Sequence, residues 1–204
     1  MEQVRATTPE GAVAAVVDLV AQLPGRVRVA VDGASAADPH AMGTRVVDAL
    51  APRCALHVRA DTFWLPAGQR FEWGKEDADS YLDGWLDLGA LHREVLDDFP
   101  ASGRALPALR DPATDRSARA ATVTLPDDGV VVVSGSVLLG QGLPFDVRVH
   151  LRLSPAALAR RTPDAEAWTL PALGRYVAER GPLEEADLVV RCDDPRHPAL
   201  VRRR

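Results

Sequence analysis

The sequence predicts an α/β fold in which a mostly parallel sheet is covered by helices on both faces. Short runs rich in β-branched residues alternate with segments whose apolar residues recur at helical spacing. One of these runs, residues 130–133, is apolar without interruption, which is typical of a strand that is buried on both faces. Strands separated by helices favour parallel pairing, because each connection has to cross one face of the sheet.

The N-terminal quarter of the chain contains the opening of a βαβ unit. A helix is predicted over residues 9–23, whose valines and leucines fall on one side, and the Pro-Gly pair at 24–25 ends it. Residues 27–31 form a short β-branched run that ends at the Asp-Gly pair 32–33. A loop of small residues then leads into a second helix over 40–51. Strand, glycine-containing turn and helix in this order open a βαβ unit.

The rest of the chain continues the alternation of strands and helices. A long helical segment is expected over residues 79–99, with a break near Gly89, and the proline-rich residues 100–128 are expected to be mostly loop. The other expected elements are strands at 55–60, 145–153 and 186–191, and helices at 155–161 and 170–179.

Length and patterning predict one domain over residues 1–204, without an internal repeat or an interdomain linker. Within this domain, residues 1–25 hold the N-terminal helix. Residues 196–204 form a basic tail that ends in three arginines at 202–204, which we interpret as a solvated chain end.

Charge and hydropathy restrict the expected partners. The net charge of −5 argues against nucleic acid, whose protein partners usually present a basic face. No apolar run approaches the ~20 residues that cross a bilayer, and residues 1–5 lack the start of a secretory signal. We therefore expect a cytoplasmic protein with a small-molecule ligand, no nucleic acid and no membrane, with a homodimer as an open alternative. The five histidines show no ligand spacing, so no metal site is predicted.

The loop after residues 27–31 is the first place to look for a ligand, because ligands of such sheets bind at the carboxyl ends of strands. Phosphate-binding loops at this place read G-x-x-x-x-G-K-[ST]. Their backbone N–H groups surround the phosphates, the lysine reaches the β- and γ-phosphates, and the hydroxyl holds Mg²⁺. Here the window reads Gly33-Ala34-Ser35-Ala36-Ala37-Asp38-Pro39-His40. It keeps the first glycine and loses the three other defining residues.

Each of the three replacements weakens phosphate binding. Asp38 adds negative charge, although a carboxylate also suits a helix N-terminus. Pro39 has neither an ammonium nor an N–H group, although it suits the first helical turn. His40 is a poor ligand for Mg²⁺, which prefers oxygen. Each lost charge-assisted hydrogen bond costs about 1.5–3 kcal/mol, so nucleotide binding should weaken by several orders of magnitude. No cofactor is predicted unless the altered loop still binds ATP and Mg²⁺, and anion binding through backbone N–H groups alone stays open.

Several segments occur in an order and spacing that match one known family. They are V-A-V-D-G at 29–33, A-D-T-F-W at 60–64, the segment 80–91, V-V-V-S-G at 131–135, R-V-H-L at 148–151, the arginine pair 160–161, and A-D-L-V-V at 186–190. Together they resemble the uridine kinase-like family of P-loop kinases, especially its compact actinobacterial members. The resemblance runs over residues 26–201. It implies a three-layer P-loop kinase-like fold with a mostly parallel sheet flanked by helices.

The resemblance also implies roles for single residues. Asp61 matches the carboxylate that takes the proton of the acceptor hydroxyl, and the alternative for it is a helix or turn cap. Arg160 and Arg161 match arginines that lie close to the transferring phosphate, and the alternative for them is surface solvation. Ser134 stands where the family usually has an acidic residue near Mg²⁺, and we interpret it as an ordinary strand-end serine. Its loss of charge fits the replacement at His40.

Four further residues are substrate-side candidates by the same resemblance. Phe63 and Trp64 belong to the motif that contains Asp61. Arg110 and Asp115 lie where family members carry a tyrosine–aspartate sequence and nucleoside-recognising groups. Because Arg110 replaces the tyrosine and Asp115 the usual histidine, uridine itself is not the expected substrate. A plain polar loop is the alternative for these two.

Three hypotheses about function follow. The first is a degenerate uridine kinase-like protein that binds a small molecule or nucleoside, with ATP-dependent phosphotransfer lost or weak. The second is an active nucleoside or small-alcohol kinase with an atypical phosphate loop, in which Arg160, Arg161 or Lys75 supplies the missing charge. The third is a purely structural partner, for instance a dimer subunit. Whether the chain is an enzyme stays open, and the first hypothesis requires Asp61 to face a cavity.

Overall fold

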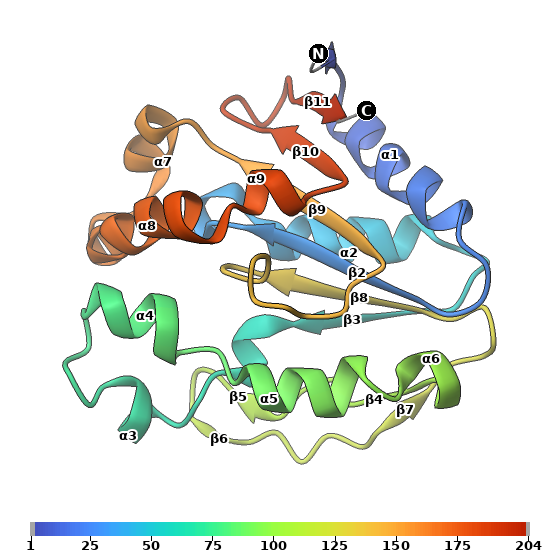
Figure 1. Ribbon diagram of the computed structural model, residues 1–204, viewed down its shortest axis with the longest axis horizontal. Coiled ribbons are helices and arrows are strands. Elements are labelled where there is room, and N and C mark those ends of the chain that lie inside the picture. The colour runs from blue at the N-terminus through green and yellow to red at the C-terminus, as the bar shows by residue number, and fades with distance from the viewer. Residues whose placement is uncertain (1–2, 203–204) are drawn as a thin grey trace.

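The computed structural model describes residues 3–202 and shows a central sheet with helices on both faces (Figure 1). The strand order is β1-β11-β10-β9-β2-β8-β3. The strands from β10 to β3 are parallel, whereas β11 pairs antiparallel with both β10 and β1. The bounds are β1 Gln3–Ala6, β2 Val27–Gly33, β3 Ala55–Arg59, β8 Val130–Gly135, β9 Val147–Arg152, β10 Leu188–Arg191 and β11 Ala199–Arg202. The expected mostly parallel α/β fold is confirmed.

Helices cover both faces because the residues of each central strand alternate between two apolar cores. Val29 and Val31 of β2 pack in one core with α1 (Pro9–Ala21) and α2 (Pro39–Ala49). Ala30, between them, packs in the other core with α5 (Leu88–Leu91) and the helical turn His92–Leu96. In β8 the valines 130 and 132 face the first core, and 131 and 133 face the second. The uninterrupted valine run is therefore buried on both faces, as expected.

The remaining helices lie around the carboxyl ends of the parallel strands or pack beside them. The α-helices are α3 Ala67–Arg70, α4 Ala78–Gly84, α6 Phe99–Ser102, α7 Pro155–Arg161, α8 Leu170–Arg180 and α9 Pro182–Glu185. Short 3-10 turns span Ser35–Ala37, Ala60–Phe63 and Asp164–Thr169. The expected helices at 9–23, 40–51, 155–161 and 170–179 are all present within a few residues of their predicted bounds.

The expected long helix at 79–99 is interrupted earlier than Gly89. α4 ends at Gly84, and Leu86 then forms an antiparallel bridge with Trp64 of the segment after β3, where Leu65 N–H donates to the Trp85 carbonyl at 2.8 Å. The Asp87 carboxylate then accepts a hydrogen bond from Ala90 N–H at 2.8 Å and begins α5. The helix is therefore interrupted between Gly84 and Leu88, because these residues pair with the segment after β3 and Asp87 caps the next helix. Gly89 lies inside that next helix.

Both ends of the described chain form strands that the sequence analysis did not expect. Residues 199–202, interpreted there as part of a solvated tail, form β11 between β10 and β1, and Leu200 and Val201 are buried. Figure 1 shows the two ends meeting at this edge of the sheet. The apolar pair is buried because Leu200 packs in the core on the α1 face of the sheet and Val201 packs in the core on the opposite face. Arg203 and Arg204 lie outside the described residues.

The loop-rich region 100–128 contains two small antiparallel pairs. β4 (Arg104–Ala105) pairs with β7 (Val123–Thr124), and β5 (Arg110–Asp111) pairs with β6 (Arg116–Ser117). Over the described residues, no helix is both long enough and apolar enough to span a membrane.

Candidate functional site

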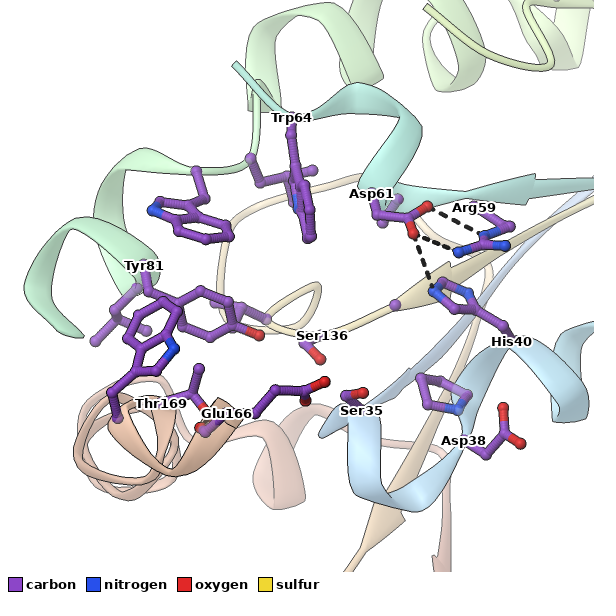
Figure 2. Close-up of a pocket in the computed structure, with 18 residues that line it drawn as sticks. Ser35, Asp38, His40, Arg59, Asp61, Trp64, Tyr81, Ser136, Glu166 and Thr169 are labelled. Atoms are coloured by element: carbon purple, nitrogen blue, oxygen red, sulfur yellow. Dashed lines mark hydrogen bonds and ion pairs between the residues drawn. The ribbon is translucent and has the colours of Figure 1, made fainter. Parts of the chain in front are cut away.

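A cavity of about 370 Å³ opens at the carboxyl ends of β2, β3 and β8 (Figure 2). This is the edge of the sheet at which the sequence analysis places a ligand. The loops after these strands form one side, and α4 with the turn Asp164–Thr169 forms the other. The lining residues are Ser35, Asp38, Pro39, His40, Arg59, Ala60, Asp61, Trp64, Tyr81, Leu82, Trp85, Leu86, Gly135, Ser136, Val137, Glu166, Trp168 and Thr169.

The loop after β2 is closed by hydrogen bonds of its own. In the turn Ser35–Ala37, Ala37 N–H donates to the Ala34 carbonyl at 2.8 Å, and Asp38 N–H donates to the Ser35 carbonyl at 2.9 Å. The Asp38 carboxylate caps α2, accepting from Ala41 N–H at 3.0 Å. Three amides of the kind that hold phosphate are thus already satisfied within the loop.

Asp38 adopts a left-handed backbone with φ of 56°. Glycine occupies such positions without a steric cost, and Asp is one of the few other residues that tolerate it. The second glycine of the phosphate-loop pattern falls at this residue. The chain has therefore kept a turn that suits glycine while placing a negatively charged cap at the N-terminus of α2.

The Ser134 hydroxyl connects two histidines, His40 and His57, beside the cavity. His40 Nδ1 and His57 Nε2 each lie 2.8 Å from Ser134 Oγ, so the hydroxyl donates to one ring and accepts from the other. Gly43 makes this approach feasible, because a Cβ at this position would stand 2.5 Å from His57 Nε2. Burial is the main cause that lowers the pKa of both imidazoles below the usual range, so both rings are neutral at pH 7.

Asp61 faces the cavity from the turn that follows β3. Its carboxylate pairs with Arg59, with Nη2 2.5 Å from Oδ2 and Nε 3.2 Å from Oδ1, and His40 Nε2 lies 3.7 Å from Oδ2 (Figure 2). The side chain is 13% exposed. No backbone amide of the described residues donates to this carboxylate, so it does not act as the cap that was the alternative for it. An ion-paired carboxylate at a cavity wall is able to accept a proton or a hydrogen bond from a ligand hydroxyl.

Aromatic rings form the wall opposite the phosphate loop. Trp85 lies at the centre, with ring centroids of Trp64 and Tyr81 at 5.1 Å and of Trp168 at 5.5 Å. The contacts of Trp85 with Trp64 and Tyr81 are edge-to-face, which is favourable because the positive ring edge meets the negative face, and the contact with Trp168 is tilted. Phe63, expected on the substrate side with Trp64, is instead fully buried in the second core.

Arg110 and Asp115 support this wall from behind and do not line the cavity. The Asp115 carboxylate accepts from Ala67 N–H at 2.9 Å and from Arg70 Nη2 at 3.2 Å, and these hydrogen bonds lower its pKa. Arg110 donates to the Asp115 carbonyl at 3.2 Å. Arg70, in turn, is almost fully buried with its guanidinium 5.0 Å from the centre of the Trp85 ring.

The expected phosphate-facing arginines lie in the last turn of α7. Arg161 donates to the Cys192 carbonyl at 2.7 Å, and Arg160 is exposed. Neither residue lines the cavity, and Lys75 lies in an exposed loop away from it. The guanidinium that does line the cavity belongs to Arg59, which the sequence analysis did not single out.

Glu166 is a second lining residue that sequence reasoning missed. It lies in the turn Asp164–Thr169, and Figure 2 shows its carboxylate pointing into the cavity on the side of Ser35 and Ser136. Ser136 Oγ donates to the Gly33 carbonyl at 2.8 Å and so ties the loop after β8 to the loop after β2. No local pattern marks either residue, because each reaches the cavity through the packing of a loop.

A buried carboxylate below the cavity fixes the end of β2. Asp32 is fully buried and accepts from three donors: Leu138 N–H at 2.8 Å, His150 Nδ1 at 2.6 Å and Tyr176 hydroxyl at 3.0 Å. Burial first, and then the Asp32 charge, raise the pKa of Tyr176 far above its usual range, so the phenol remains a donor. This network connects β2, β9 and α8 and holds the phosphate-loop position in place.

The strand order, the loop after β2 and the cavity define the class as a P-loop kinase-like α/β fold. Solved structures agree. The chain is similar to a "possible uridine kinase" from Bacillus stearothermophilus, with a TM-score of 0.71 and 19% identity over 88% of this chain and 97% of that one. It is also similar to a "putative fructose transport system kinase" from Silicibacter sp. TM1040, with a TM-score of 0.62 and 22% identity over 85% and 94% of the two chains. No protein-family model and no curated protein matches.

These likenesses confirm the fold that the motif resemblance implied. At such low identity they concern the fold, and function has to be argued from the site.

Proposed function

We propose that this protein binds a small molecule in the cavity and that its capacity for ATP-dependent phosphoryl transfer is lost or weak. The observation that carries the proposal is the conformation of the loop after β2. Its amides at Ala37, Asp38 and Ala41 are bonded within the loop, and a carboxylate occupies the N-terminus of α2. A phosphate at this helix end would have to displace Asp38 and would meet its charge.

The surroundings of the loop oppose a nucleotide as well. The phosphate-loop lysine is Pro39, and the side chain that reaches towards the loop from the turn Asp164–Thr169 is the acidic Glu166. ATP carries its negative charge on phosphates that P-loop proteins neutralise with lysine, arginine and Mg²⁺. Two carboxylates at the same end of the cavity have the opposite effect.

The residues at the Mg²⁺ position do not fit the metal either. His40 and Ser134 stand where the phosphate-loop hydroxyl and the acidic strand-end residue are expected, and the two are bonded to each other. Mg²⁺ prefers oxygen ligands in octahedral geometry, and the Ser134 hydroxyl is fully buried between two imidazoles. We therefore derive no chemical step through Mg²⁺ or ATP.

The acceptor side of the cavity retains the features of a binding site. Asp61 faces the cavity, and the rings of Trp64, Tyr81 and Trp168 line the opposite wall. A volume of about 370 Å³ falls within the ~300–1,000 Å³ of ordinary small-molecule sites, which combine apolar walls with a few polar groups. This combination suits a nucleoside or another compact polar molecule with a planar or apolar part.

The first test is a calorimetric titration of the purified protein with Mg·ATP. We expect no detectable heat at millimolar ATP. A matched variant, Asp38→Gly with Pro39→Lys and His40→Ser, restores the phosphate-loop pattern and should bind ATP more tightly than the natural chain. Micromolar binding of ATP by the natural chain would overturn the proposal.

Asp61 favours a second candidate, an active kinase of a nucleoside or small alcohol with an atypical phosphate loop. Its carboxylate lies at the cavity, where it would take the proton of an acceptor hydroxyl. Arg59, beside it, is a cation that would compensate phosphate charge. This candidate requires ATP-dependent phosphorylation of an acceptor from a broad panel of alcohols and nucleosides. The activity should disappear in Asp61→Asn. If the natural chain turns over none of these acceptors, the kinase candidate is contradicted.

A further inference from the structure

The cavity carries an excess of negative charge. Three acidic residues line it, Asp38, Asp61 and Glu166, against the single arginine Arg59. His40 contributes no charge at pH 7, because burial lowers its pKa. Three negative charges and one positive charge leave a formal charge of −2 in the lining. A ligand that enters the cavity is therefore selected by its own charge.

The three carboxylates differ in how their charge is compensated. Asp61 is paired with Arg59, and Asp38 caps the N-terminus of α2. The Glu166 carboxylate has no hydrogen bond or ion pair with any residue in the described part of the chain, and it points into the cavity (Figure 2). Its field also contributes to the raised pKa of Tyr81, after the larger effect of burial. Glu166 is thus the acid that is free to pair with a ligand.

The aromatic wall is suited to the same kind of ligand. Cations are attracted to the electron-rich faces of tryptophan and tyrosine rings. The aromatic wall already makes cation–π contacts with one side chain of the protein. The guanidinium of Arg70 lies 5.1 Å from the centre of the Trp64 ring and 5.0 Å from that of the Trp85 ring. Arg70 does not line the cavity, so it contacts these rings from within the protein. Trp64 and Trp168 also line the cavity, where a ligand is able to contact them.

We propose that the cavity takes a small organic cation, an amine whose ammonium group pairs with Glu166 and whose apolar or aromatic body lies against the tryptophan wall. The inference rests on the proposed function, because it names the ligand class of the same cavity. It separates three ligand classes. Anions such as nucleotides are repelled, neutral nucleosides gain only the stacking, and cations gain both stacking and a charge-assisted hydrogen bond.

A charge series with one shared body tests the inference. The probes are phenethylamine, 2-phenylethanol and phenylacetate, which place a positive, neutral or negative group on the same phenylethyl or benzyl frame. In calorimetric titrations the affinity should decrease in the order amine, alcohol, acid. The amine should bind about tenfold more tightly than the alcohol, because its ammonium group makes a charge-assisted hydrogen bond with Glu166. Raising the salt concentration should weaken the amine and leave the alcohol almost unchanged.

Glu166→Gln keeps the shape of the side chain and removes its charge. It should weaken phenethylamine about tenfold, to near the affinity of 2-phenylethanol, and leave the alcohol unaffected. Glu76→Gln is the matched control, because Glu76 is also an exposed acid and lies in a loop away from the cavity. Trp168→Leu should weaken the amine and the alcohol alike, and an unfolding curve for each variant shows that it is folded.

Several outcomes overturn the inference. They are equal affinity for amine and alcohol, tighter binding of phenylacetate, unchanged amine binding in Glu166→Gln, and no binding of any probe at millimolar concentration. The proposed function fails by a different result, binding of Mg·ATP, which the charge series does not measure. Binding of uridine or 2-phenylethanol in preference to the amine, without ATP binding, contradicts the cation class and leaves the proposed function standing.

Discussion

Two sets of Asp, His and hydroxyl side chains lie at the carboxyl ends of the parallel strands and differ in their access to solvent. In the closed set, the side chains of Asp32 and His150 are 0% and 7% exposed, and Tyr176 is buried. In the open set, Asp61 is 13% and His40 30% exposed at the cavity, and only the partner hydroxyl of Ser134 is fully buried. Similar groups are therefore used in two different environments.

Asp32 and Asp61 have different roles because of this difference in access. Asp32 is surrounded by three donors from three separate elements, and no ligand reaches it. Asp61 is bonded to a neighbour only two residues away and has one face on the cavity. A carboxylate in the closed set holds elements together, whereas a carboxylate in the open set remains able to interact with a ligand.

A substitution that disrupts the closed set should change the free energy of unfolding most. Asp32→Asn removes a buried charge and turns one acceptor into a donor that faces His150 or Tyr176. We expect the free energy of unfolding to fall by about 3 kcal/mol, in the range for breaking a buried ionic hydrogen-bond network. Urea unfolding measures it. Asp61→Asn is the counterpart in the open set and should change stability by less than about 1 kcal/mol. Equal losses for the two variants would show that the open set is structural too.

A smaller effect probes the packing behind the open set. In Gly43→Ala the new methyl group meets His57 Nε2 and Ser134 Cβ, so we expect a loss of about 1–3 kcal/mol from overpacking. Gly174→Ala in α8 is the matched control, because nothing lies within 4 Å of its added Cβ, and alanine should stabilise the helix by up to about 1 kcal/mol. Urea unfolding of both variants should therefore give opposite signs. Stabilisation by Gly43→Ala would contradict the tight approach of His57 to Ser134.

The smallest effect is the pH dependence that the open set confers. Burial lowers the folded-state pKa of His40 and His57 below the ordinary histidine value of about 6.5, so the unfolded chain binds more protons as the pH falls through this value. Stability should therefore decrease as the pH is lowered from about 7.5 through 6.5 towards the folded-state pKa. Unfolding at several pH values measures the slope, and His57→Gln should reduce it. A slope that is unchanged in this variant would assign the dependence to other groups.

The parts of the site that depend on local sequence could be predicted, whereas contacts between distant segments could not. Asp61 follows a recognisable motif at a strand end, and the sequence alone shows that positions 39 and 40 hold a proline and a histidine, without a lysine or a hydroxyl. The partners of Asp115 and Arg161 could not be predicted. Their hydrogen bonds with Ala67 and with the Cys192 carbonyl join segments that are tens of residues apart.

Sequence alone predicted the type of most elements, the edge of the sheet that carries the cavity, and the side chains available in the loop after β2. These properties depend on short-range periodicity and on the chemistry of single side chains. Three outcomes depended on tertiary contacts: residues 199–202 form a strand between β10 and β1, α5 begins at Leu88 after the Asp87 cap, and Glu166 points into the cavity. Each of these outcomes depends on contacts between segments far apart in the chain, and local patterns do not encode which distant segment a loop or strand will meet.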